Sequence, residues 1–149
     1  MSTAANNPVE GSLTLVVERV FPHPPEKLWR ALTESPLVAQ WMMNNDFEAV
    51  PGHKFQFRAD PMPNWNGIVD CEVLVVDPQK RLSYNWGVGN AESGMQWVVA
   101  LTLTPADGGT RLRMEQSGFS PDQKGAHQGA SYGWKRFFGG LEKLMGEME

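Results

Sequence analysis

The chain has 149 residues and a formal net charge of −4 at pH 7, and 41% of its residues are hydrophobic. This length predicts one domain with its own core, and the negative balance argues against nucleic-acid or anionic-membrane partners, which need clustered cations. No apolar run approaches the roughly 20 residues of a membrane helix, and the first residues lack the pattern of a signal peptide. The single cysteine excludes an internal disulfide framework. We therefore expect a cytoplasmic protein.

The first part of the chain predicts a tail followed by a strand. Residues 1–11 are small and polar, and we expect a disordered tail there, ahead of one domain over residues 12–149. The segment Ser12–Phe21 places Leu13, Leu15, Val17 and Phe21 on one face at a period of two. This period is typical of a half-buried strand.

Two short helices are predicted over residues 22–43. Pro24 and Pro25 favour a helix start, because the first helical turn has no use for the N–H that proline lacks. Ser35 and Pro36 predict a second start, with Ser35 as the N-cap.

Six further strands are predicted, mostly antiparallel because the turns between them are short. Their ranges are Phe47–Val50, Lys54–Ala59, Ile68–Val76, Arg81–Trp86, Met95–Thr104 and Thr110–Ser117. The Pro-rich residues 60–67 lack ladder donors and predict a loop that carries Trp65. In the third of these strands, one apolar face is expected to hold Val69, Cys71, Val73 and Val75.

The last segment predicts a long amphipathic helix that begins at Ser120 and Pro121. Gly129, Gly133 and Gly140 form a row beside its apolar stripe. Each interior glycine costs about 1 kcal/mol relative to alanine. The row therefore suggests close approach of backbone or ligand, with poor local optimisation as the alternative.

This order of elements predicts an α+β fold. A curved antiparallel sheet of about six or seven strands wraps around the long C-terminal helix, and two short helices follow the first strand. The space between sheet and helix can be solid core or a cavity.

Five segments carry a resemblance to a known superfamily. They are FPHPPEKLWRALTESPLVAQW (residues 21–41), VPGHKFQFR (50–58), VLVVDPQKRLSYNW (73–86), TPADGGTRLRMEQSGF (104–119) and YGWKRFFGGLEKL (132–144). In this order the segments resemble the START-like superfamily, also called SRPBCC or birch-pollen-allergen-like, with its helix-grip fold. Within it the chain is most similar to bacterial proteins related to the C-terminal domain of the activator of the ninety-kilodalton heat-shock chaperone ATPase. A Gly-His pair at Gly52 and His53, where Gly-Gly is common, departs from the pattern.

The resemblance implies a cavity between sheet and helix that takes apolar or amphipathic ligands. Some members of the superfamily are enzymes, such as polyketide aromatase/cyclases, while many characterised members only bind or carry a ligand. The chaperone-activating role belongs to relatives with an additional N-terminal domain, so it is not carried over.

The polar residues predict no catalytic centre, metal site or cofactor. His23, His53 and His127 are far apart and lack metal-ligand spacing. Cys71 is flanked by two acids, which oppose thiolate formation, so it is interpreted as a small buried hydrophobe. No phosphate loop, dinucleotide fingerprint or nucleophile elbow occurs.

An unusually aromatic inward-facing set supplies the candidate ligand contacts. Its members are Trp41, Phe55, Phe57, Trp65, Cys71, Tyr84, Trp86, Trp97, Met114, Trp134, Phe138 and Leu141. The same residues are acceptable as filled core, and the resemblance favours the cavity. In that interpretation the Tyr84 hydroxyl orients the ligand and the loop with Trp65 closes the mouth.

We therefore expect a protein that binds a small apolar or aromatic molecule without chemistry, in a stress, resistance or carrier role. One alternative is a cyclase- or hydrolase-type enzyme that uses the same cavity with Tyr84 or His127 as the acid. Another is a protein-interaction module, related to the chaperone activators, whose cavity is solid core. A homodimer is also possible, because edge strands need cover.

Overall fold

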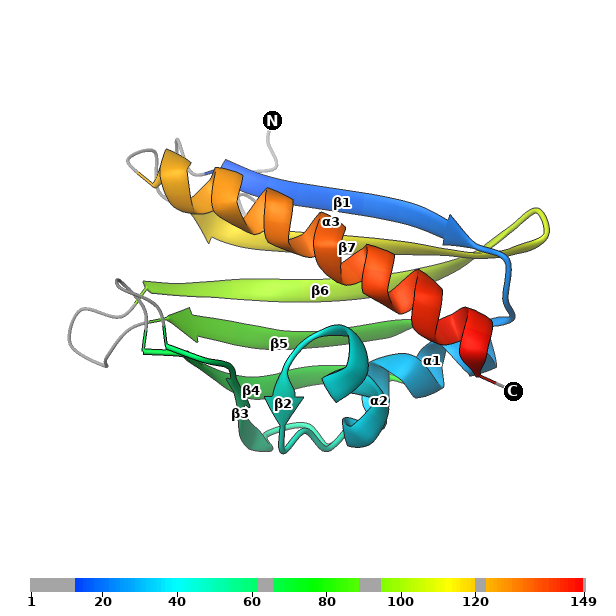
Figure 1. The fold of residues 1–149 in the computed structure, drawn as a ribbon, viewed down its shortest axis with the longest axis horizontal. Coiled ribbons are helices and arrows are strands. Elements are labelled where there is room, and N and C mark those ends of the chain that lie inside the picture. Colours follow the sequence, from blue (N-terminus) through cyan, green and yellow to red (C-terminus); the bar gives the residue numbers. More distant parts are fainter. Residues whose placement is uncertain (1–12, 62–65, 89–94, 120–122, 149) are drawn as a thin grey trace.

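The computed structural model describes residues 13–61, 66–88, 95–119 and 123–148 (Figure 1). The predicted tail over residues 1–11, Trp65 and the helix start at Ser120 and Pro121 lie outside these residues. The elements in chain order are β1 (Leu13–Phe21), α1 (Pro25–Thr33), α2 (Ser35–Trp41), β2 (Asn44–Asn45), β3 (Lys54–Arg58), β4 (Ile68–Asp77), β5 (Arg81–Val88), β6 (Met95–Ala106), β7 (Gly109–Phe119) and α3 (Lys124–Glu147).

Seven strands of the described chain form one sheet in the order β1-β7-β6-β5-β4-β3-β2. All neighbouring strands are antiparallel. The sheet curls into a half-barrel, and α3 lies obliquely across its inner face while α1 and α2 cover one end (Figure 1). The predicted α+β helix-grip architecture is confirmed.

The two short helices form where the prolines predict them, but their cap differs from the prediction. Glu34, not Ser35, is the N-cap of α2. The Ser35 hydroxyl instead donates to Oδ1 of Asn45 at 2.8 Å. The indole Nε1 of Trp41 donates to the carbonyl of Ala31 at 2.8 Å, which joins the two helices inside the core.

The predicted strand at Phe47–Val50 is wrong, because the short strand β2 lies earlier, at Asn44–Asn45. The Asn45 side chain explains the shift. Its Oδ1 accepts the Phe47 N–H at 3.0 Å and its Nδ2 donates to the Met43 carbonyl at 3.0 Å. Such local side-chain bonds turn the backbone away from a ladder.

The inner faces of the strands and of α3 make one continuous hydrophobic core. Val69, Cys71 and Val73 are buried on β4 as predicted, but Val75 is 40% exposed. The register of β4 against β5 shifts between Val73 and Val75. A bulge of this kind reverses the face on which the following side chains lie.

A glycine is required where the start of β7 passes the end of β1. A Cβ at Gly109, where β7 begins, would collide with the carbonyl oxygen of Phe21 at the end of β1. The close approach aligns the two strands in the register that pairs Phe21 with Thr110. The Thr110 hydroxyl then donates to the His23 carbonyl at 2.8 Å.

Candidate ligand-binding site

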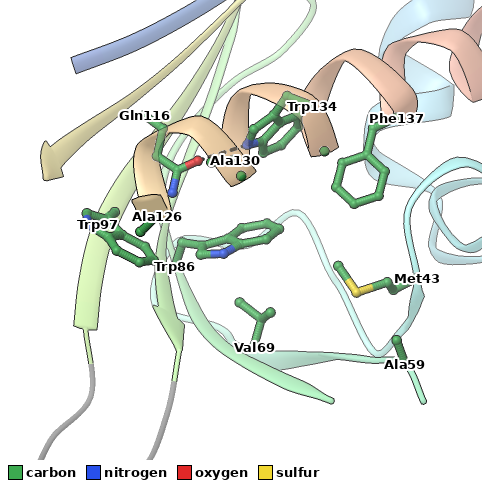
Figure 2. Close-up of a pocket in the computed structure, with 12 residues that line it drawn as sticks. Met43, Ala59, Val69, Trp86, Trp97, Gln116, Ala126, Ala130, Trp134 and Phe137 are labelled. Atoms are coloured by element: carbon green, nitrogen blue, oxygen red, sulfur yellow. Dashed lines mark hydrogen bonds between the residues drawn. The ribbon is translucent and has the colours of Figure 1, made fainter. Parts of the chain in front are cut away.

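A pocket of about 740 Å³ lies between the inner face of the sheet and the first half of α3 (Figure 2). It reaches the surface, since Ala59 and Gly129 in its lining are exposed. Volumes of this size are typical of sites for small organic molecules. The described lining residues are Met43, Ala59, Val69, Trp86, Trp97, Gln116, Ala126, Gly129, Ala130, Gly133, Trp134 and Phe137.

Three tryptophans make the largest walls of the pocket. Trp86 and Trp97 are directly paired across β5 and β6, so both indoles lie on the inner face. Trp134 faces them from α3, with its ring centre 5.6 Å from that of Trp86. Figure 2 shows the three rings, which come from two strands and the helix, gathered around one space. Such rings offer large apolar surface and stacking faces.

Apart from Trp134 and Phe137, the wall that α3 contributes is made of small residues, and we call these the helical wall. Ala126, Gly129, Ala130 and Gly133 recur at intervals of three and four, so they share one face of α3. A Cβ at Gly129 or Gly133 would meet no atom within 4 Å. These two glycines of the predicted row therefore border the pocket. Gly140 behaves differently, because a Cβ there would lie 3.6 Å from Cα of Trp41.

One buried polar side chain completes the pocket lining. Gln116 of β7 is 1% exposed, and its Oε1 accepts a hydrogen bond from Trp134 Nε1 at 2.8 Å. This bond connects the sheet to the helix at the pocket wall (Figure 2). Gln116 is not among the contacts predicted from the sequence. Its signal was the alternation of β7, which places Gln116 on the same inward face as Leu112 and Met114.

A smaller hollow of about 270 Å³ lies on the other side of Phe137. Gly133 and Phe137 line both spaces, and Trp41, Met42 and Arg136 line only the smaller one. The ring of Phe137 stands nearly perpendicular to Trp134, with ring centres 5.5 Å apart, and to Trp41 at 6.4 Å. Phe137 therefore separates the two hollows.

Several predicted contacts instead lie in an aromatic cluster behind the pocket. The cluster consists of Phe47, Phe55, Phe57 and Tyr84, with ring centres of neighbours 5.1 to 6.2 Å apart. It supports the pocket wall through Phe57, whose ring centre is 5.4 Å from that of Trp86. Tyr84 is buried there, and burial raises the pKa of its hydroxyl, with Cys71 adding to the rise. Tyr84 is not among the described residues that line the pocket.

The remaining predicted contacts are also distributed through the core. Met114, Phe138 and Leu141 are fully buried and do not border the pocket. Trp41 lines the smaller hollow, and Phe55 with Cys71 borders a separate hollow of about 330 Å³. Burial raises the pKa of the Cys71 thiol, and Asp70 and Asp46 raise it further. Of the eleven candidates that the structure describes, it brings three to the pocket, and these are Trp86, Trp97 and Trp134.

The histidines do not converge. His53 stacks near Phe55, with ring centres 6.3 Å apart, while the His127 ring meets the edge of Phe119 at 5.2 Å. Burial lowers the pKa of His23, and the charge of Lys27 adds to the effect. In the part of the chain that the structure describes, no group of three or more His, Cys, Asp or Glu could hold a metal ion. Among the same residues no helix is long and apolar enough to span a membrane.

A family model described as "Activator of Hsp90 ATPase homolog 1-like protein" matches residues 22–146. The chain belongs to this family. The predicted membership is therefore confirmed, and with it a ligand-binding fold of START-like type. No curated protein matches the chain.

Several solved structures are similar to this chain, and the proteins they show come from bacteria. Protein MLL2253 from Mesorhizobium loti is 50% identical, with a TM-score of 0.84, and the match covers 92% of this chain and 99% of that one. Protein BH1534 from Bacillus halodurans is 25% identical, with a TM-score of 0.74 and coverage of 91% and 99%. DynU16, a protein in the dynemicin biosynthetic locus, is 26% identical with a TM-score of 0.73. That match covers 89% of this chain and 46% of DynU16.

Proposed function

We propose that this protein binds a small apolar or aromatic molecule in the pocket between the sheet and α3, without transforming it. The observation that carries the proposal is the pocket of about 740 Å³, whose walls are three tryptophans and a row of small helical residues. An apolar cavity with a few polar groups is the usual form of a small-molecule site.

The shape of the helical wall supports a binding role. Each interior glycine costs about 1 kcal/mol of helix stability relative to alanine. Gly129 and Gly133 border open space, where a larger side chain would fill the pocket. These two glycines lower the stability of α3, and they leave space in the pocket for a ligand.

The chemistry of the lining favours binding over catalysis. The described lining residues include no Asp, Glu, His, Lys, Arg, Cys or Tyr, and general acid–base catalysis relies on such groups. Tyr84, a candidate acid for the enzymatic alternative, lies in the aromatic cluster with a raised pKa. His127, the other candidate, packs against Phe119, and its Nε2 is 3.3 Å from the Thr14 carbonyl oxygen.

Native mass spectrometry of freshly purified protein, with a denatured control, tests the proposal. A mass excess that disappears on denaturation would support it and give the mass of the retained molecule. A thermal-shift screen with aromatic and lipid compounds extends the test to ligands lost in purification. A bare mass together with no thermal shift would contradict the proposal and favour the interaction module.

A further inference from the structure

The polar groups of the pocket differ in whether they already have partners. Among the described lining residues, four side chains carry nitrogen donors, and these are Trp86, Trp97, Gln116 and Trp134. The indole of Trp134 donates to Gln116 Oε1 at 2.8 Å, and the indole of Trp97 donates to Gln123 Oε1 at 3.4 Å. Both of these donors are committed within the protein.

The orientation of the Gln116 amide follows from this pairing. An indole N–H can only donate, so the atom of Gln116 that faces Trp134 must be the oxygen. The NH₂ group therefore faces the other way. Figure 2 shows the Gln116 nitrogen turned from Trp134 toward the space beside Trp97 and Trp86. Among the described residues, no hydrogen-bond partner occurs for this nitrogen.

Trp86 supplies a second donor of the same kind. Its side chain lines the pocket, and the residue is only 8% exposed. Within the described chain its Nε1 has no hydrogen-bond partner. Buried polar groups are almost always paired, and an unpaired one is costly.

We propose that the pocket selects apolar or aromatic molecules that carry an oxygen acceptor, such as a ketone or quinone carbonyl, and that Gln116 Nε2 and Trp86 Nε1 donate to it. The inference rests on the proposed binding function and adds the polarity of the ligand. Both unpaired groups are donors, while the Gln116 oxygen is already engaged by Trp134. A ligand that presents only an N–H at this point would leave these donors unpaired.

Three rigid tricyclic compounds test this preference. Fluorenone, fluorene and carbazole have nearly the same shape, but their bridging groups are a carbonyl, a methylene and an N–H. We expect fluorenone to bind about tenfold more tightly than the other two, the value of a hydrogen bond to an otherwise unpaired donor. In ¹H–¹⁵N spectra, fluorenone should move the Trp86 indole and Gln116 amide signals downfield, and fluorene should not.

Substitutions test whether the donors on Trp86 and Gln116 cause the preference for fluorenone. Trp86→Phe removes one donor and keeps an aromatic wall, so the affinity ratio of fluorenone to fluorene should fall toward one. Gln116→Met should do the same, but it also removes the partner of Trp134, so Trp86→Phe is the decisive variant. Trp29→Phe is the control, because Trp29 is half-buried on α1 outside the pocket, and the ratio should not change.

The outcomes separate this inference from the proposed function. Equal affinity for the three compounds, or a ratio that Trp86→Phe does not alter, would overturn the acceptor preference and leave binding intact. If none of the three compounds moves any tryptophan signal, the pocket does not take aromatic molecules of this size. The acceptor preference would then be overturned, and the native mass and the thermal-shift screen would decide the proposed function separately.

Discussion

Replacing Gly133 by leucine is expected to fill the pocket while preserving the fold. Gly133 is half-buried at the C-terminal end of the helical wall, and a Cβ there would meet no atom within 4 Å. Leucine is about 0.8–1 kcal/mol more favourable than glycine inside a helix. We therefore expect the Tm of Gly133→Leu to rise by about 3 °C in calorimetry.

The same substitution should weaken ligand binding. The leucine side chain occupies space that the ligand needs, and overpacking of this kind costs about 1–3 kcal/mol. The expected loss is about 5- to 150-fold in affinity for fluorenone, measured by isothermal titration calorimetry. Stability and binding thus change in opposite directions.

Gly139→Leu is the matched control. Gly139 is exposed on the same helix, has open space around its Cβ and does not line the pocket. It should show a similar gain in Tm with unchanged affinity. If Gly133→Leu binds fluorenone as tightly as Gly139→Leu, the pocket is not the binding site. A lower Tm for Gly133→Leu would show that the space beside the helix is not open.

Three further experiments test other parts of the structure. Phe137→Ala joins the two hollows that this ring separates, so alkylbenzenes with longer chains should bind; an unchanged chain-length limit would contradict the separation. Burial raises the pKa of Cys71, so iodoacetamide at about pH 8 should label the folded protein far more slowly than the urea-unfolded chain, as mass spectrometry can follow. The Gln56 N–H donates to Asp46 at 2.8 Å and holds the pKa of that carboxyl below its ordinary value of 3.8. The resulting stability is present above this value and is lost as pH falls through the folded pKa. The urea midpoint of unfolding should therefore fall less on acidification in Asp46→Asn than in the unchanged protein.

Local patterns were sufficient to predict most elements. Alternating apolar residues predict β6 and β7, and prolines predict the starts of α1 and α2. Each of these signals lies within a few residues of the element it predicts. The errors lie where side chains compete with the backbone. Asn45 bonds to its neighbours and ends β2 early, and a bulge after Val73 turns Val75 outward. Neither event changes the hydrophobic pattern, so the sequence alone could not show them.

The site was harder to predict than the fold. Periodicity indicates which residues face inward, but it does not separate those that border a space from those that fill the core. Trp86 on β5 and Phe57 on β3 both face inward with their ring centres 5.4 Å apart, yet only Trp86 is among the described residues that border the pocket. The difference depends on packing across the sheet and against α3. The more informative signals were missing bulk at Gly133 and a polar residue, Gln116, on an otherwise apolar face.

The contrast between the two walls bears on how such proteins diverge during evolution. The sheet wall combines ladder hydrogen bonds with the aromatic cluster, so most changes there disturb folding. The helical wall consists of Ala126, Gly129, Ala130 and Gly133, which contribute almost no bulk. Each can be exchanged for a larger residue and reshape the pocket at little cost in stability. A lineage can therefore acquire a new ligand by altering one face of one helix, while the inherited scaffold stays intact.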